Sequence, residues 1–329
     1  MEQTVRYEWV DYAKVLSICF VISYHVPPRD SSFFADVISM LRMPAFFLIA
    51  GYLFRTEKFT SLFNFIRHRG IQLLIPYTSF FILFYILWLV VGRDVVGSEE
   101  LAIPIWKPLV QYILGTPSIV LAPYWFVCCL FVTQVVYYFL AKIISRNFLF
   151  VLCLLVPYLN CLFDLSPLPW QFAKTLNFLP FYGFANILKT QILRLNKGDF
   201  FYCFLAFSVA LLCVYGRRVS DNEWICSTLY TLGGLLMLPL YIWFCKQIPK
   251  TSFLVDFSRF VGRNSIIILA VQNYMIGALI LIANRFYEWP IFRSIALSNI
   301  VVTMGVLMCS LILVALINRY EPFMIGRKN

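Results

Sequence analysis

Charged side chains are scarce in this sequence. Only 13% of its 329 residues are Asp, Glu, Lys or Arg, whereas 61% are hydrophobic. A soluble globular protein contains about 25% charged residues, so this composition excludes the soluble classes. It predicts an integral membrane protein that is embedded in a lipid bilayer, with residues 1–329 forming a single transmembrane domain.

Residues that could hold a metal ion are also few. The chain has two histidines, and its ten cysteines form no CxxC pair. Most of the cysteines lie inside apolar runs, where cysteine behaves as a small hydrophobic residue. We therefore expect no bound metal, no permanently bound cofactor and no disulfide framework. The formal net charge of +11 comes from Lys and Arg spread among the loops, which predicts no nucleic-acid partner.

Apolar runs long enough to cross a bilayer as helices recur along the whole chain. Ten candidates lie at residues 10–28, 33–54, 72–92, 122–143, 148–165, 176–192, 199–216, 226–246, 264–284 and 296–317. The pattern predicts an all-α bundle of about ten transmembrane helices. The short amphipathic stretch 105–114, in the longest loop, is a candidate for a helix on the membrane surface.

Basic residues between these runs predict the orientation of the bundle. Most of the 27 Lys and Arg residues fall on one side if the N-terminus is cytoplasmic. Cytoplasmic loops of membrane proteins are enriched in Lys and Arg, so we expect both termini in the cytoplasm. The pair Arg217-Arg218 falls on the opposite side and does not reverse the count.

The first apolar run contains two titratable residues, Lys14 and His25. In a helix they would lie about 16 Å apart along the axis, roughly three turns, and would project from nearly the same face. Titratable residues inside a membrane segment usually face the bundle interior or a water-filled cavity and indicate a functional site. Histidine is also the side chain best suited to moving a proton near neutral pH. In the predicted orientation Lys14 is at the inner end, and His25 is at the outer end.

The second run adds Asp36, Arg42 and Gly51. Arg42 would be unfavourable in an apolar helix unless it faces a cavity or a partner. Alternatively, it extends to the outer membrane surface. Asp36 lies near the level of His25, where it could orient the imidazole or pair with Arg42. Gly51 allows close packing of helices.

Arg67, His68 and Arg69 precede the third run at the predicted inner face. Guanidinium groups bind phosphate in a bidentate manner, so this cluster could hold a phosphate-rich ligand. The alternative is an ordinary basic anchor next to a membrane span. Trp125 opens the fourth run as either an interfacial anchor or a substrate contact. Gln272 in the ninth run could line a cavity or bond a neighbouring helix.

Taken together, these segments resemble the membrane-bound acyltransferase family 3, particularly its sugar O-acetyltransferase-like members with a DYAK-type opening. The matching segments follow the family's order across nearly the whole chain: DYAKVLSICFVISYHV, RMPAFFLIAGYLF, the basic segment before LLIPY, YWFVCCL and VGRNSIIILAVQ. Lys14 and His25 fit the family pattern of a basic residue, ten others and a histidine. Ala50, Gln72 and Gln272 stand where relatives usually have Ser, Arg and His.

The resemblance implies an acyl-CoA-dependent O-acyltransferase of a bacterial inner membrane. Such an enzyme would move acetyl from acetyl-CoA, its co-substrate, to a sugar hydroxyl of a cell-envelope or exported glycan. The resemblance also implies that His25 is the catalytic histidine, and that Lys14 and Arg69 bind acyl-CoA or shape the site. The candidate site then comprises His25, Lys14 and Asp36 for catalysis, Lys14, Arg67 and Arg69 for the donor, and Arg42, Trp125 and Gln272 for the acceptor.

Two other classes share the many spans and the intramembrane polar residues. A transporter or flippase of lipid-linked saccharides is the first, but we find no pair of Gly- or Pro-broken spans in corresponding halves, which would indicate inverted repeats. A polysaccharide polymerase is the second, and it would be expected to have a larger outer loop. Acyl-CoA dependence separates the acyltransferase from both. The acceptor sugar, the acyl chain, a covalent acyl-histidine and the oligomeric state stay open at this point.

Overall fold

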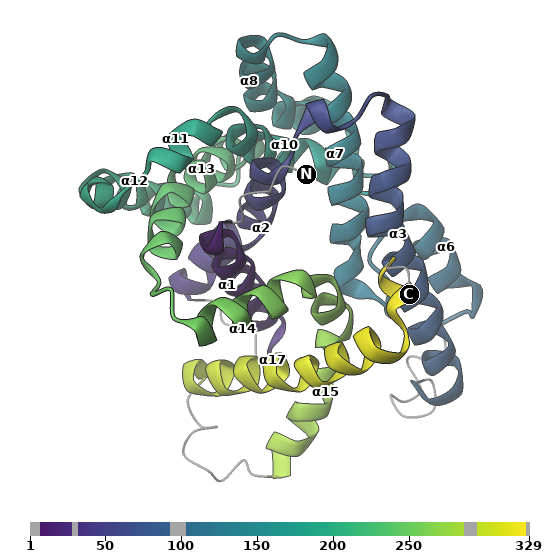
Figure 1. The fold of residues 1–329 in the computed structure, drawn as a ribbon. Helices are drawn as coiled ribbons and strands as arrows, with labels where there is room; N and C mark the ends of the chain where they lie inside the picture. The colour runs from purple at the N-terminus through teal and green to yellow at the C-terminus, as the bar shows by residue number, and fades with distance from the viewer. Residues whose placement is uncertain (1–6, 28–31, 93–102, 286–294, 327–329) are drawn as a thin grey trace.

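The computed structural model describes residues 7–27, 32–92, 103–285 and 295–326, and these residues are helical without any β-strand (Figure 1). The prediction of an all-α fold is therefore confirmed. The main helices are α1 (Glu8–His25), α2 (Phe33–Leu53), α3 (Leu62–Leu87), α7 (Trp125–Ile143), α8 (Arg146–Leu155), α10 (Phe172–Ile187), α12 (Phe200–Val219), α13 (Glu223–Gln247), α14 (Ser252–Arg263), α15 (Ser265–Arg285) and α17 (Ile295–Tyr320). Short helical segments join them: η1 (Thr56–Lys58), η2 (Trp88–Gly92), α6 (Trp106–Leu114), η3 (Ala122–Tyr124), η4 (Val156–Tyr158), α9 (Leu159–Leu162), α11 (Lys189–Arg194), η5 (Lys197–Asp199) and η6 (Pro322–Ile325).

Seven helical segments of the described residues are long and apolar enough to cross a membrane. They include α2, α3, α7, α12, α13, α15 and α17. The predicted count of about ten is not reached by this measure. The predicted runs that fall short are the first, the fifth and the sixth. The first helix carries the charged residues Glu8, Asp11 and Lys14. The fifth run is divided into α8, η4 and α9, and the sixth is divided into α10 and α11.

Two elements differ from the prediction. The third helix begins at Leu62, ten residues earlier than expected, because Ser61 caps it by accepting a hydrogen bond from the backbone N–H of Asn64. The basic residues 67–69 therefore lie inside α3 and not before its start. The amphipathic helix α14 was not predicted, since its 12 residues are too short and too polar for a span.

The first helix lies inside the bundle and is held at its middle and near its end. It packs against α2, α13, α14, α15 and α17. Helices α3 and α7 pack against each other elsewhere in the bundle (Figure 1). At the middle of α1, the Ser17 hydroxyl lies 2.7 Å from the hydroxyl of Tyr241 on α13. Toward its end, Asn299 on α17 accepts a hydrogen bond from the Ser23 hydroxyl at 2.6 Å and donates one to the Ser23 carbonyl at 2.8 Å. These contacts set the position of the functional face of α1.

Gly51 brings α2 and α10 close together. A Cβ atom at this position would overlap the backbone carbonyl oxygen of Tyr182. Asn186 of α10 donates hydrogen bonds to the carbonyl oxygens of Gly51 and Phe54 at 3.2 and 3.1 Å. The Gly51 carbonyl also accepts a hydrogen bond from the backbone N–H of Phe54. Asn186 therefore adds a side-chain donor at the end of α2, where the last carbonyl oxygens lack their usual helical partners.

Replacing Gly51 with alanine is expected to lower the free energy of unfolding by about 1–3 kcal/mol or more. The backbone of Tyr182 cannot move aside as a flexible side chain could. The measurement is the thermal unfolding midpoint of the detergent-solubilised protein. Gly277→Ala is the matched control, because a Cβ atom at Gly277 meets nothing within 4 Å. Equal midpoints for the two variants would contradict this account of the α2–α10 contact.

Candidate active site

One face of α1 lines two cavities inside the helix bundle. Lys14 and Ile18 line the first cavity, and Val21, Tyr24 and His25 line the second. Positions 14, 18, 21 and 25 follow the three- and four-residue steps of a single helical stripe. The structure therefore places Lys14 and His25 on the same face, as their spacing predicts.

The first cavity, here named the Lys14 cavity, has a volume of about 190 Å³. Helices α1, α2, α3, α7 and α15 enclose it, and its polar lining consists of Lys14, Arg69, Gln134 and Ser265. The guanidinium of Arg69 donates a hydrogen bond to the side-chain oxygen of Gln72 at 2.9 Å. Gln72 therefore orients Arg69.

The second cavity, here named the His25 cavity, has a volume of about 220 Å³. Its polar and aromatic lining includes Tyr24, His25, Arg42, Trp125 and Lys174, which come from α1, α2, α7 and α10. The structure thus brings together three residues predicted for the site, His25, Arg42 and Trp125. It adds Lys174, which the sequence pattern did not indicate.

Aromatic rings hold the two cations of the His25 cavity. The guanidinium carbon of Arg42 lies 3.3 Å from the centroid of the Tyr24 ring. The same ring meets the His25 imidazole edge-on, with 5.5 Å between the ring centroids. The Lys174 ammonium lies 4.0 Å from the centroid of a Trp125 ring. Cations at such distances are attracted to the ring faces, so these contacts hold both positive charges in the lining of the His25 cavity.

The two cavities adjoin. Phe46, Phe126 and Leu269 line both of them, and we call these three side chains the junction. The rings of Phe46 and Phe126 are 5.3 Å apart between centroids. A ligand that extends from Lys14 to His25 must therefore pass the junction.

Two tyrosine hydroxyls fix the side of the site formed by α7 and α15. Tyr124 donates a hydrogen bond to the carbonyl oxygen of Ile266 at 2.8 Å. Tyr274 donates one to the carbonyl oxygen of Val120 at 2.8 Å. Both bonds tie the segment that enters α7 to α15, and Trp125 follows this segment directly. The position of Trp125 in the cavity is thus set by backbone contacts.

Asp36 does not join the site. Its carboxylate pairs with Arg218 of α12 at 3.3 Å, with about half of each side chain exposed. The predicted pairing of Asp36 with His25 or with Arg42 is therefore not found, and Asp36 does not line the His25 cavity. The reason is tertiary: the end of α12 packs beside the start of α2 and supplies a closer cation.

Arg67 and Arg69 do not form one cluster. Arg67 is exposed and lines a shallow surface groove with Gly70, Thr78 and Ser79, whereas Arg69 turns inward to the Lys14 cavity. Because both lie in α3, two positions along the helix place their side chains about 200° apart. Only Arg69 therefore shares a cavity with Lys14.

Gln272 is fully buried and does not line either cavity. It lies three positions after Leu269 on α15, next in the stripe that faces the site. Within the described residues, neither polar atom of its amide has a hydrogen-bond partner. Leaving a buried polar group without a partner costs about 1–3 kcal/mol, so Gln272 is the least satisfied polar side chain near the junction.

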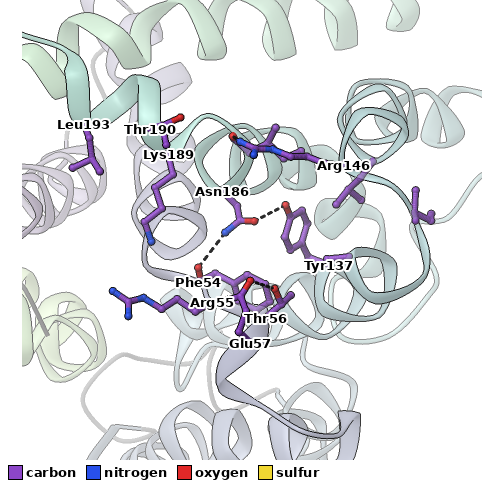
Figure 2. A pocket seen from close by; sticks show the side chains of 14 residues that line it. Phe54, Arg55, Thr56, Glu57, Tyr137, Arg146, Asn186, Lys189, Thr190 and Leu193 are labelled. Atoms are coloured by element: carbon purple, nitrogen blue, oxygen red, sulfur yellow. Dashed lines mark hydrogen bonds between the residues drawn. The ribbon is translucent and has the colours of Figure 1, made fainter. Parts of the chain in front are cut away.

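A larger cavity, of about 620 Å³, lies elsewhere (Figure 2). It is lined by Arg55, Arg146 and Lys189, with Asn186 between Phe54 and Tyr137, and shares no lining residue with the other two cavities. Burial and the neighbouring Arg55 lower the pKa of Lys189. None of the predicted site residues lies there, so this cavity supplies control positions for the tests below.

The helices and the two cavities define an integral membrane protein whose candidate site is enclosed by its spans. A family model described as an acyltransferase domain matches residues 7–319, nearly the whole chain. The protein therefore belongs to acyltransferase family 3 and is a membrane acyltransferase, which confirms the resemblance seen in the sequence segments. No curated protein and no solved structure matches the chain.

Proposed function

We propose that this acyltransferase moves acetyl from acetyl-CoA to a sugar hydroxyl of a cell-envelope or exported glycan, with His25 as the catalytic residue. The observation that carries the proposal is the pair of adjoining cavities. One has Lys14 and Arg69 in its lining, the other has His25, and both meet at the junction. This arrangement suits a reaction in which two substrates approach one reacting centre from different directions.

The donor fits the side of Lys14. The phosphate groups of acetyl-CoA are anionic, and Lys14 and Arg69 provide the matching positive charge. The rest of the Lys14 cavity is lined mostly by apolar side chains, which suits the uncharged arm that carries the thioester. Passage of this arm along the junction would bring the acetyl carbonyl beside His25.

The acceptor fits the side of His25. The imidazole takes the proton from the sugar hydroxyl while the hydroxyl oxygen attacks the carbonyl carbon of the thioester. The C–S bond then breaks, an ester forms, and the CoA thiolate leaves and is protonated by the imidazolium. Arg42 is placed to stabilise the negative charge that develops on the carbonyl oxygen. Transient transfer of acetyl to His25 itself is the alternative route.

The proposed orientation follows from the loop charges. With both termini in the cytoplasm, the Lys14 cavity faces the cytoplasmic pool of acetyl-CoA, and the His25 cavity faces the outer side. A bacterial inner membrane is the location that this proposal implies.

The test is transfer of radiolabelled acetyl from acetyl-CoA in membranes that contain the protein, compared with membranes that lack it. We expect label in the envelope glycan only when the protein and acetyl-CoA are both present, and none from free acetate. A protein-dependent movement of lipid-linked saccharide without any labelling would instead support a flippase. Labelling that does not depend on the protein would contradict the proposal.

A further inference from the structure

Lys174 is a cation of the His25 cavity that the proposed chemistry does not use. It lies near the start of α10, is half-buried, and is held 4.0 Å from the centroid of a Trp125 ring. General base catalysis by His25 requires no lysine, and Arg42 already supplies a positive charge beside the imidazole. The role of Lys174 must therefore be sought in what the cavity binds.

The described lining of the His25 cavity contains basic residues, Lys174 among them, and no acidic residue. No ion pair among the described residues includes Lys174, and Asp36, an acid near the start of α2, is paired with Arg218. A half-buried ammonium is poorly solvated. An anionic group that enters the cavity would therefore be attracted more strongly than in water.

We propose that the acceptor is a sugar acid, whose carboxylate binds Lys174 while a hydroxyl of the same residue is presented to His25. The inference rests on the proposed function, because it assigns the acceptor of that reaction. The Trp125 ring, which lies under the ammonium, holds Lys174 at the wall of the cavity where the carboxylate would bind. The cavity, at about 220 Å³, is smaller than the roughly 300–1,000 Å³ of pockets for drug-sized ligands, and so it holds one sugar residue.

Lys174 then acts as a specificity-determining residue. The carboxylate anchors one edge of the sugar ring, and a rigid ring carries its hydroxyls at fixed distances from that anchor. The ammonium thus selects both the acidic sugar and the hydroxyl that reaches the imidazole. A neutral sugar would enter the same cavity without this anchor and would bind more weakly.

The test compares sugar acids with their neutral carboxamides. The methyl glycosides of glucuronic acid, galacturonic acid and N-acetylneuraminic acid are each paired with the carboxamide, which retains every hydroxyl. Acetyl transfer from acetyl-CoA is measured on the purified protein in lipid nanodiscs. We expect native protein to prefer at least one acid over its amide by at least about tenfold in kcat/KM. In Lys174→Met the ratio of kcat/KM for the acid to kcat/KM for its amide should fall to near one, mainly because KM for the acid rises. Lys174→Arg should restore the preference.

Lys189→Met is the matched control. Lys189 is also half-buried and also lies over an aromatic ring, 5.1 Å from the centroid of Tyr52, but it lines the separate large cavity. Its replacement should leave the preference unchanged. The inference is overturned if native protein reacts equally with acid and amide, or if Lys174→Met keeps the preference for the acid. It is also overturned if envelope glycan is labelled while none of the three sugar-acid glycosides is labelled. If neither glycan nor glycoside is labelled, the proposed function fails, and the inference fails with it.

Discussion

Replacing His25 with alanine is expected to lower acetyl transfer by about 10²–10⁴-fold, the usual contribution of a general acid–base residue. The imidazole lines the His25 cavity at the end of α1, against the edge of the Tyr24 ring. No other histidine lines either cavity. Arg42, which lines the same cavity, stays protonated, so it cannot take the proton of the acceptor hydroxyl in place of His25.

The matched control is His68→Ala, which removes the only other histidine of the chain. His68 lies on α3 and packs against Phe59, with 5.2 Å between ring centroids, and it does not line the two cavities. We expect this variant to keep most of the transfer rate. Initial rates are compared at equal amounts of monodisperse protein. Equal loss in both variants, or no loss in His25→Ala, would remove His25 from the mechanism.

The helical nature of the fold could be predicted because a bilayer leaves the backbone few alternatives. Apolar runs of about 20 residues satisfy their hydrogen bonds only as helices in lipid. The shared face of Lys14 and His25 could be predicted for a similar reason. Both lie on one helix, where the period of 3.6 residues fixes the direction of each side chain.

Contacts between helices could not be read from the sequence in this way. Lys174 reaches the His25 cavity only because α10 packs against α2 and α7, and no spacing in the sequence relates it to His25. The same limit explains the prediction for Asp36, which seemed level with His25 along the membrane normal. Height along a helix does not determine which neighbour a side chain faces, and Arg218 of α12 is the neighbour that it meets.

The basic residues of α3 show a third kind of limit. The sequence predicts Arg67 and Arg69 as one cluster because they are two positions apart just before the third apolar run. Once Ser61 caps the helix and α3 starts at Leu62, the same spacing turns them to different sides. A displaced helix start thus changed which residues could act together.

Closing the junction is the second change with a large expected effect. Leu269 lines both cavities and is buried, so Leu269→Trp would insert a bulky ring between Lys14 and His25. We expect acetyl transfer to fall by about 10²-fold or more, because a displacement of about 1 Å at the reacting centre already has effects of that size. Binding of the nucleotide end of the donor should be much less affected, since Lys14 and Arg69 are unchanged.

Two variants accompany Leu269→Trp. Leu281→Trp makes the same substitution on the same helix at a residue that is 70% exposed, and it should transfer acetyl at close to the native rate. Leu269→Ala enlarges the junction, and it should raise the rate with butyryl-CoA relative to acetyl-CoA. The second variant keeps the account testable even if the tryptophan disturbs the packing of α15.

The central claim is that the Lys14 and His25 cavities form one path for the acyl donor. Two quantities are measured in nanodiscs: the rate of acetyl transfer and the binding of radiolabelled acetyl-CoA. Native protein, Leu269→Trp and Leu281→Trp are compared in both. The account predicts that Leu269→Trp binds acetyl-CoA but transfers almost no acetyl, while Leu281→Trp does both. Native transfer by a folded Leu269→Trp protein would contradict it, because the donor would then reach the acceptor without passing the junction.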